Sequence, residues 1–282
     1  MWNVGEPLFC DIELGARIER VEAGLIATGS EAALARLGTA EGCVIPLAGG
    51  VACCTEPGSP LNKVAGLGFA GVPDAGELDE VERRFAARGV PVQVELAHLA
   101  DPGVGEMLTG RGYRLVGFEN VLGRPLRDRP EQVETPGVVV RDSGDAEFDR
   151  WLDTVVGGFA HPDTQGVASH EEFPRDVLES AVTDLTAAAG MRRYLALADG
   201  QVAGGASMRI ADGVAQLTGA ATLPAYRRRG VQTALLAARL AEATAQGCDL
   251  AVVVTQPASK SQQNAERRGF TLLYTRAVLV KG

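Results

Sequence analysis

The chain has 282 residues, of which 46% are hydrophobic and 22% charged, and its formal net charge is −9 at pH 7. This length suits two domains of ordinary size better than one, and the acidic balance argues against a general nucleic-acid-binding surface. No apolar run reaches membrane-spanning length, and no basic segment precedes an apolar one near residue 1, so we expect neither a membrane anchor nor a secretory signal.

The first half of the chain predicts alternating helices and strands. Helices are expected over residues 12–26, 30–37, 76–88 and 103–110, and strands over 43–48, 51–55, 62–70 and 91–97. The turn after the third strand carries Asp74, Glu77, Asp79 and Glu80 and no arginine. Carboxylates at a helix start satisfy the helix dipole from within and repel a phosphate, so this turn predicts a capped helix without an anionic ligand.

A linker is expected at residues 124–137, where Pro125, Pro130 and Pro136 interrupt any regular element. It divides the chain into predicted domains at residues 1–123 and 138–282. In the second domain we expect helices over 145–156, 171–185, 231–246 and 259–268. The strands are expected over 138–141, 194–198, 201–209, 214–222 and 250–255, with a final strand pair in 271–280.

A basic turn joins the strand 214–222 to the long helix that follows it. Arg227, Arg228 and Arg229 precede Gly230, which lets the backbone approach a ligand closely. The first turn of a helix has unpaired N–H groups and the positive end of the macrodipole, so this turn predicts a phosphate or pyrophosphate site. No Gly-Lys-Ser/Thr follows and the spaced glycines of a dinucleotide fingerprint are missing, which excludes both of those loops.

The turn resembles the acyl-CoA pyrophosphate loop of the GNAT superfamily of N-acetyltransferases. Arg227 and Gly230 match its Arg/Gln-x-x-Gly-x-Gly/Ala pattern, although Gln232 stands where a small residue is usual. The order of elements and the Asn264-to-Phe270 ending extend the resemblance over roughly residues 136–282. It implies that acetyl-CoA is the co-substrate and that it contacts Gly219, Ala220, Ala221, Thr222, Leu223, Arg227, Arg228, Arg229, Gly230, Val231, Gln232, Thr233 and Asn264.

The first half resembles a diverged copy of the second. Residues 111–115 (Arg-Gly-Tyr-Arg-Leu) line up with 268–272 (Arg-Gly-Phe-Thr-Leu), within a similar order of helices and strands. The expected fold is therefore α/β (α+β). It has two tandem GNAT-like domains, each a mixed, mostly antiparallel twisted sheet flanked by helices. Only the C-terminal copy keeps the basic turn, so we expect a single acetyl-CoA site.

The catalytic residues have to be sought outside the acyl-CoA loop. Many GNAT enzymes place a tyrosine where this chain has Ala265, so the acid for the leaving thiolate is either absent or another hydroxyl. Ser261 is the nearest candidate, with Ser259 and Tyr274 behind it. The loop 159–173 lies where the family binds its acceptor, and from it we select Asp163 and Glu172 as candidates for the base.

Five cysteines form no CxxC pair and three histidines make no ligand cluster, so we expect no metal site. The odd number of thiols suits a reducing compartment, the cytoplasm, and the Ala, Gly and Arg content is typical of bacterial proteins from GC-rich genomes. We predict a monomer or homodimer that transfers acetyl to a primary amine of a small molecule or peptide by direct attack. Alternatives are transfer of a longer acyl group, transfer to a hydroxyl, or a non-catalytic acyl-CoA sensor.

Overall fold

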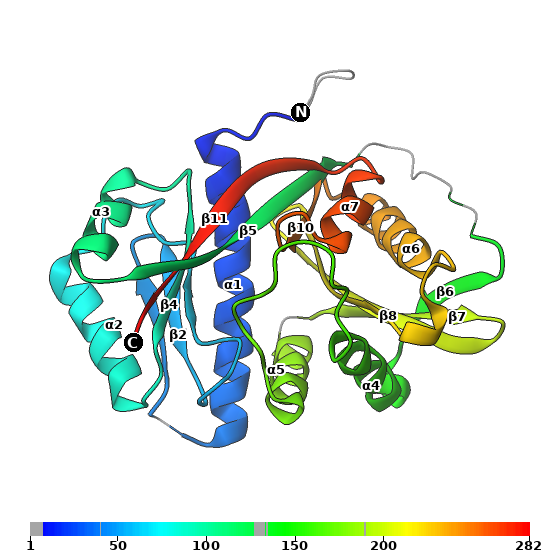
Figure 1. Ribbon diagram of the computed structural model, residues 1–282, viewed down its shortest axis with the longest axis horizontal. Helices are drawn as coiled ribbons and strands as arrows, with labels where there is room; N and C mark the ends of the chain where they lie inside the picture. Colours follow the sequence, from blue (N-terminus) through cyan, green and yellow to red (C-terminus); the bar gives the residue numbers. More distant parts are fainter. Residues whose placement is uncertain (1–7, 40, 127–132, 134, 189) are drawn as a thin grey trace. The chain divides into compact units, whose positions relative to one another are not determined.

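The computed structural model describes residues 8–39, 41–126, 133, 135–188 and 190–282 (Figure 1). The chain divides into two compact units, each assembled from segments that are distant in sequence. Unit 1 contains residues 1–8, 122–167 and 190–271, and unit 2 contains residues 9–121, 168–189 and 272–282. The predicted domains, residues 1–123 and 138–282, are instead continuous segments of the chain, one for each copy of the repeat. Residues 127–132 and 134 of the predicted linker lie outside the described residues.

Unit 2 has a sheet in the order β1-β2-β3-β4-β11-β5. Only β3 and β4 are parallel among the pairs β1–β2, β2–β3, β3–β4 and β4–β11. Its elements are α1 (Ile12–Leu37), β1 (Cys43–Leu47), β2 (Gly50–Cys54), β3 (Lys63–Ala65), α2 (Ala75–Ala87), β4 (Val92–Ala97), α3 (Pro102–Gly110), most of β5 (Arg114–Pro125), α5 (Arg175–Ala188) and β11 (Thr271–Lys281).

Helices cover both faces of this sheet. Leu78 and Phe85 of α2 and Leu108 of α3 are fully buried in one hydrophobic cluster, which also contains side chains of β1, β2 and β4. Ile26 of α1 and Ala181 of α5 belong to a second cluster with side chains of β2 and β3. Unit 2 therefore completes its second layer with a helix from the second half of the sequence.

The two helices predicted over residues 12–37 are one helix, α1. The expected break around Gly29 does not occur, because that glycine serves packing: a Cβ atom there would lie 2.6 Å from Cδ2 of Leu185 in α5. The Thr28 hydroxyl donates to the Gly24 carbonyl at 2.9 Å, within the helix. Asp11 caps the start through Leu14 N–H, and Gly38, with φ of 62°, ends the helix.

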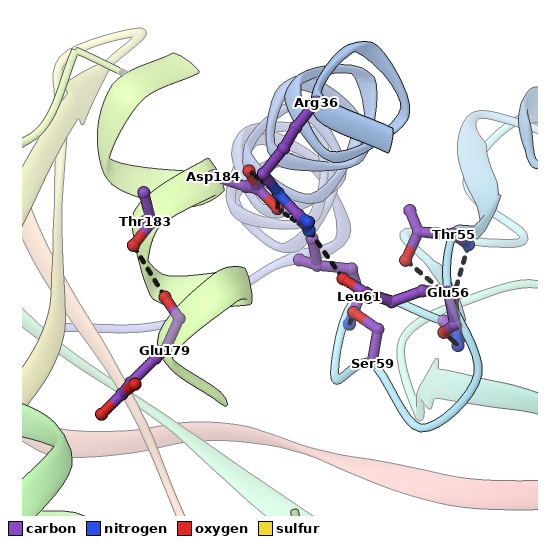
Figure 2. A network of polar contacts seen from close by, with 9 residues as sticks. Arg36, Thr55, Glu56, Ser59, Leu61, Glu179, Thr183 and Asp184 are labelled. Atoms are coloured by element: carbon purple, nitrogen blue, oxygen red, sulfur yellow. Dashed lines mark hydrogen bonds and ion pairs between the residues drawn. The ribbon is translucent and has the colours of Figure 1, made fainter. Parts of the chain in front are cut away.

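A charged network also fastens α5 to α1 (Figure 2). Arg36 at the end of α1 donates from Nε to Asp184 Oδ1 at 3.0 Å and from Nη2 to Oδ2 at 2.8 Å. The same Nη2 donates to Glu56 Oε1 at 2.6 Å. The Asp184 side chain is 5% exposed and that of Arg36 is 37% exposed, and the bidentate geometry of the pair fixes the relative orientation of the two helices.

The C-terminal residues form one strand, β11, and the predicted strand pair in 271–280 was wrong. From Arg276 to Lys281, β11 pairs antiparallel with β4, in register from Ala97 back to Val92. A continuous ladder of this kind requires an uninterrupted partner, and no glycine or proline interrupts residues 271–281. Helix α5 and strand β11 thus both belong to unit 2, although both follow the linker in sequence.

Unit 1 has the strand order β5-β10-β9-β8-β7-β6, and only the part of β5 from Leu122 onward belongs to this unit. Strands β6 to β9 are antiparallel neighbours, and β9 and β10 are parallel. The elements are β6 (Val138–Asp142), α4 (Phe148–Phe159), β7 (Arg192–Ala198), β8 (Gln201–Ala211), β9 (Val214–Thr222), α6 (Val231–Ala245), β10 (Leu250–Thr255) and α7 (Lys260–Glu266).

Two adjacent glycines bring a helix close to each face of this sheet. A Cβ atom on Gly204 would lie 2.8 Å from Val231 in α6, and one on Gly205 would lie 2.9 Å from Val155 in α4. Trp151 of α4 is fully buried and donates its indole N–H to the Ala206 carbonyl at 3.0 Å. Because successive residues of a strand face opposite sides, this Gly-Gly pair serves both helices.

Candidate functional site

Strands β9 and β10 part from one another within unit 1. Their parallel pairing runs from Val214 opposite Leu250 to Gln216 opposite Val252. Strand β9 then continues to Thr222 and β10 to Thr255, with no further pairing between them in the described residues. The edge of β9 after Gln216 therefore presents backbone N–H and C=O groups that an extended ligand with amide groups could pair with.

A bulge interrupts β9 at this open edge. Gly205 of β8 lies opposite Ala221 and Ser207 opposite Thr218, so Gly219 and Ala220 together face one residue of β8. Gly219 has φ of +57°, and a Cβ atom there would lie 2.8 Å from Ser207 Oγ. Glycine is therefore required twice, for the left-handed conformation and for space. A bulge re-aims backbone N–H groups, and here it lies at the centre of the open edge.

A buried arginine supports the bulge from α6. Arg239 is 3% exposed and donates from Nη1 to the carbonyls of Ser207 at 3.1 Å and Thr218 at 3.3 Å. Its Nε donates to the Leu235 carbonyl at 3.1 Å. No carboxylate of the described chain pairs with it, and burial lowers its pKa to about 10, so it stays charged at neutral pH. The cation lies directly beneath the backbone at which the strand bulges.

The helix that follows the basic turn begins without a side-chain cap. Gly230 is the N-cap residue of α6 with φ of 81°, and no side chain accepts from the first-turn N–H groups. The first helical bond is that of Ala234 N–H to the Gly230 carbonyl, at 2.9 Å. The N–H groups of Val231, Gln232 and Thr233 are thus left for another acceptor. The uncapped helix start beside the basic turn agrees with the geometry expected of a phosphate or pyrophosphate site, and the binding of an anion here stays a prediction.

The three arginines of the turn are placed differently. Arg227 donates to the carbonyl of His161, and Arg229 pairs with Asp199 and lies 5.7 Å from the ring centroid of Tyr226. Arg228 is exposed, and among the described residues its side chain has no polar partner. Arg228 is therefore the side chain of this turn most readily available to an incoming phosphate.

Two buried threonine hydroxyls lie near the ends of the diverging strands and have no hydrogen-bond partner among the described residues. Thr222 Oγ1 in β9 and Thr255 Oγ1 in β10 both lack one in the described structure. A buried hydroxyl without a partner is costly, and both residues lie at the ends of the parted strands. Sequence reasoning included Thr222 but missed Thr255, whose signal was its position as the last residue of a buried apolar strand.

The candidate acid lies at the start of the short helix α7. Ser259 is the N-cap residue and accepts from Gln262 N–H at 3.1 Å, whereas Ser261 is exposed within the first turn. Asn264 is half-buried on the same helix. Ala265 is 4% exposed and packs in the core cluster with Phe270, so this position faces the interior. Ser261 is thus a free hydroxyl at an exposed helix start, and its role stays a prediction.

The candidate bases fall into different units. Asp163, in unit 1, accepts from Gln165 N–H at 3.0 Å in a loop that bonds to the β10–α7 connection through Val167 N–H and the Pro257 carbonyl at 3.1 Å. Glu172 is exposed and belongs to unit 2, just before α5. Tyr274, also in unit 2, is buried and donates to Glu19 at 2.6 Å. Only Asp163 therefore lies in the same unit as the basic turn.

Two general properties of the described residues can be stated beside this site. None of their helices is both long and apolar enough to cross a lipid bilayer. They also contain no group of three or more His, Cys, Asp or Glu side chains arranged to hold a metal ion.

Comparison with known proteins identifies the fold. A GCN5-related N-acetyltransferase from Kribbella flavida is similar over 90% of this chain and 95% of its own, with a TM-score of 0.60 and 22% identity. A tandem GNAT protein from the clavulanic acid biosynthesis pathway is similar over 90% and 87%, with a TM-score of 0.57 and 14% identity. A GCN5-related N-acetyltransferase from Sphaerobacter thermophilus is similar over 73% of this chain and 66% of its own, with a TM-score of 0.55 and 16% identity.

At these identities the similarity concerns the fold, and it confirms the predicted class of a mixed, mostly antiparallel sheet flanked by helices. The comparison with curated protein sequences found no match. The sequence model of the Acetyltransferase (GNAT) family matches residues 161–270, which include the bulged strand, the basic turn, α6 and α7. The chain therefore carries a domain of the acetyltransferase (GNAT) family at residues 161–270.

Proposed function

We propose that unit 1 binds acetyl-CoA and transfers its acetyl group to a primary amine of a small molecule or peptide. The observation that carries this proposal is the continuity between an open, bulged strand edge and an uncapped helix start, Gly219 to Thr233. The first feature suits the amide-containing pantetheine arm, and the second suits the pyrophosphate.

In this proposal the backbone performs most of the binding. The open edge of β9 after Gln216 pairs with the amides of the pantetheine arm, and the first-turn N–H groups of α6 hold the pyrophosphate. Arg228 contributes positive charge without having to leave another partner. The N–H groups at the Gly219–Ala220 bulge polarise the thioester carbonyl, and Arg239 keeps that backbone in place.

The chemical step needs two proton movements and no covalent enzyme intermediate. The neutral amine nitrogen bonds to the acetyl carbon, the C–S bond breaks, and the CoA thiolate takes up one proton while the amine loses one. We assign the proton donor to Ser261 and the proton acceptor to Asp163, with Glu172 as the other candidate base. Ser261 would act on the sulfur of the thioester that the backbone of β9 holds, and Asp163 on the nitrogen of the incoming amine.

The proposal is tested by calorimetry and a thiol-release assay on the full chain. We expect one acetyl-CoA per chain, and release of free CoA with at least one member of a panel of amines, amino acids, aminoglycosides and peptides. Two equivalent acetyl-CoA sites would contradict the assignment to unit 1. Parallel measurements with longer acyl-CoA compounds, and with alcohols as acceptors, would decide between acetyl transfer and those alternatives.

One observation supports a second candidate function, an acyl-CoA sensor without catalysis. Ala265 stands where many GNAT enzymes have a tyrosine, and it packs into the core rather than facing a ligand. Tight binding of acetyl-CoA without turnover on any acceptor would favour the sensor. Because the buried cysteines Cys43, Cys53 and Cys54 form no disulfide, we propose a reducing cytoplasm as the location for either activity.

A further inference from the structure

Unit 2 buries a group of charged side chains that the proposed function does not use. We call it the carboxylate cluster: Glu19 of α1, Lys63 of β3, Glu95 of β4, Glu119 of β5 and Arg276 of β11. Arg276 Nε donates to Glu19 Oε1 at 2.8 Å, and Lys63 Nζ donates to Glu95. Charged groups of this kind are rarely buried unless they are fully paired or serve a ligand.

The cluster is not fully paired. Arg276 Nη1 lies 3.7 Å from both Glu95 Oε2 and Glu119 Oε2, which is too long for a hydrogen bond. Arg276 is 1% exposed, yet its Nη2 has no partner in the described structure, and neither has Glu19 Oε2. Glu119 accepts no hydrogen bond from any described residue. A network meant only to stabilise the unit would satisfy these groups, because each buried orphan is destabilising.

Solvent reaches the cluster on one side. The side chains of Glu119 and Lys63 are 18% and 14% exposed, whereas those of Glu19, Glu95 and Arg276 are 3% exposed or less. His170 stands beside this opening, because its Nδ1 lies 3.5 Å from where a Cβ atom on Gly117 of β5 would be. Its Nε2 is 3.0 Å from Gln93 Oε1. A ligand would therefore meet Glu119 first, with Lys63 and His170 beside it.

The charge of the cluster selects the class of ligand. The three carboxylates of the cluster, Glu19, Glu95 and Glu119, outnumber its two cations, Lys63 and Arg276, and Glu171 also acts on Lys63. Burial, and next the charge of Glu95, raise the pKa of Glu119 to about 7, although Lys63 and Arg276 oppose the rise. One added positive charge would let Glu119 ionise and would offset the excess of carboxylates.

We propose that the carboxylate cluster of unit 2 is a binding site for a small primary ammonium compound, held by Glu119 together with Glu95. This site goes beyond the proposed acetyl transfer, because it is built from residues of unit 2 alone and requires no acetyl-CoA. Carboxylate oxygens without hydrogen-bond donors are the partners that an ammonium group, with three donors and no acceptor, needs.

Binding at this site is linked to a proton. Near pH 6 Glu119 is mostly protonated, and an arriving ammonium ion must displace that proton; near pH 8 the carboxylate is already free. With a pKa of about 7 for Glu119, the affinity should rise about tenfold between pH 6 and pH 8. The charged groups that act on Glu119 are Glu95, Lys63, Arg276 and Glu22.

The experiment uses the full chain without acetyl-CoA and propylammonium chloride as the probe. Calorimetry should show saturable binding that strengthens about tenfold from pH 6 to pH 8. At pH 6 it should also show proton release, measured in buffers of different ionisation enthalpy. Butan-1-ol, which has a similar size and no charge, should not bind. Acetyl-CoA binding by the same preparation is measured separately, so failure of this site and failure of the proposed function are distinguished.

Matched variants decide the assignment. Glu119→Gln keeps the size of the side chain, and it should weaken propylammonium binding at pH 8 at least tenfold and abolish the pH dependence. Glu106→Gln makes the same charge change at an exposed position on α3 and should leave binding unchanged. Since Glu119→Gln removes a carboxyl that ionises against burial, the variant should fold. Equal binding by Glu119→Gln and the unaltered chain, or no saturable binding, would overturn the proposal.

Discussion

The connection from β3 to α2 in unit 2 and the connection from β9 to α6 in unit 1 occupy the same place in two similar orders of elements, yet they differ at every step. Strand β3 has three residues and pairs with β4 up to Ala65, after which Gly66, with φ of 71°, turns the chain. Strand β9 has nine residues and extends beyond its pairing with β10. Unit 2 therefore has no long strand edge beside its turn for an extended ligand.

The starts of α2 and α6 differ in which groups accept hydrogen bonds from the N–H groups of the first turn. Asp74 and Glu77 form a capping box at α2, in which Glu77 accepts from Asp74 N–H at 2.9 Å. Gly230 at α6 offers no side chain at all. A helix start can thus be closed by its own carboxylates or left open for an anion, and the choice is made by a few residues at the turn.

The largest expected effect comes from separating the sequence halves. A fragment of residues 135–282 keeps the β9–α6 connection but leaves α5 and β11 without α1 and β4. We expect an insoluble or molten fragment, because the apolar faces of both segments would be exposed. Near-ultraviolet circular dichroism and dye binding would check this. A soluble fragment that unfolds cooperatively and turns over amines would show that unit 1 is independent of unit 2.

Next in size is the conversion of the open helix start into a closed one. Gly230→Asp should weaken acetyl-CoA binding about a hundredfold or more, because φ of 81° strains any side chain and the carboxylate repels the pyrophosphate. Gly230→Ala separates the two causes, since among the described residues a Cβ atom there meets only Thr135, at 3.5 Å. Asp74→Ala should cost about 1 kcal/mol of stability and leave binding unchanged in calorimetry.

The role of the α7 start can be sharpened with two serines. If Ser261 protonates the thiolate, Ser261→Ala should lower kcat ten- to a thousandfold, roughly the range for a lost general acid, with acetyl-CoA affinity preserved. Ser259→Ala is the matched control and should cost about 1 kcal/mol of stability, because it removes the N-cap. If kcat is unchanged in Ser261→Ala, the role of proton donor to the thiolate would belong to solvent or to Ser259.

The smallest effect concerns the arginine beneath the bulge. Arg239→Met should lower kcat about tenfold more than it raises the KM for acetyl-CoA, because the carbonyls of Ser207 and Thr218 lose their common donor. Arg83→Met is the control: it lies nine residues after the N-cap of α2, as Arg239 does in α6, but it is exposed and pairs with Glu80. Equal kinetics in both variants would remove Arg239 from the site.

Much of the fold could be predicted from sequence because hydrophobic periodicity reports on local structure. The strands of unit 1 and the helices α2, α4 and α6 lie close to their expected positions. The break predicted near Gly29 failed because that glycine serves contact with Leu185, 156 residues away. The membership of α5 and β11 in unit 2 could not be predicted from local sequence patterns. It depends on contacts between residues far apart in the chain, such as Arg36 with Asp184.

The candidate site was predictable where its chemistry lies in the backbone. A glycine after basic residues at a strand-to-helix turn indicates an open helix start on elementary grounds. The bulge at Gly219 and the support from Arg239 were not predictable, because a single arginine within an amphipathic helix pattern is ordinarily exposed. The carboxylate cluster could not be predicted either, because its five residues lie on five different elements and follow no regular spacing in the sequence.

The pairing of β11 with β4 bears on how the protein is made. A ribosome that has completed β4 at Ala97 must still add residues 98–281 before the partner of that strand exists. At about 5–20 residues per second this takes on the order of ten seconds or more, during which one side of β4 is an open template for pairing with other chains. The nascent chain therefore exposes an unpaired strand edge throughout most of its synthesis. Changes that slow translation after residue 97 should reduce the yield of soluble protein without altering the finished structure.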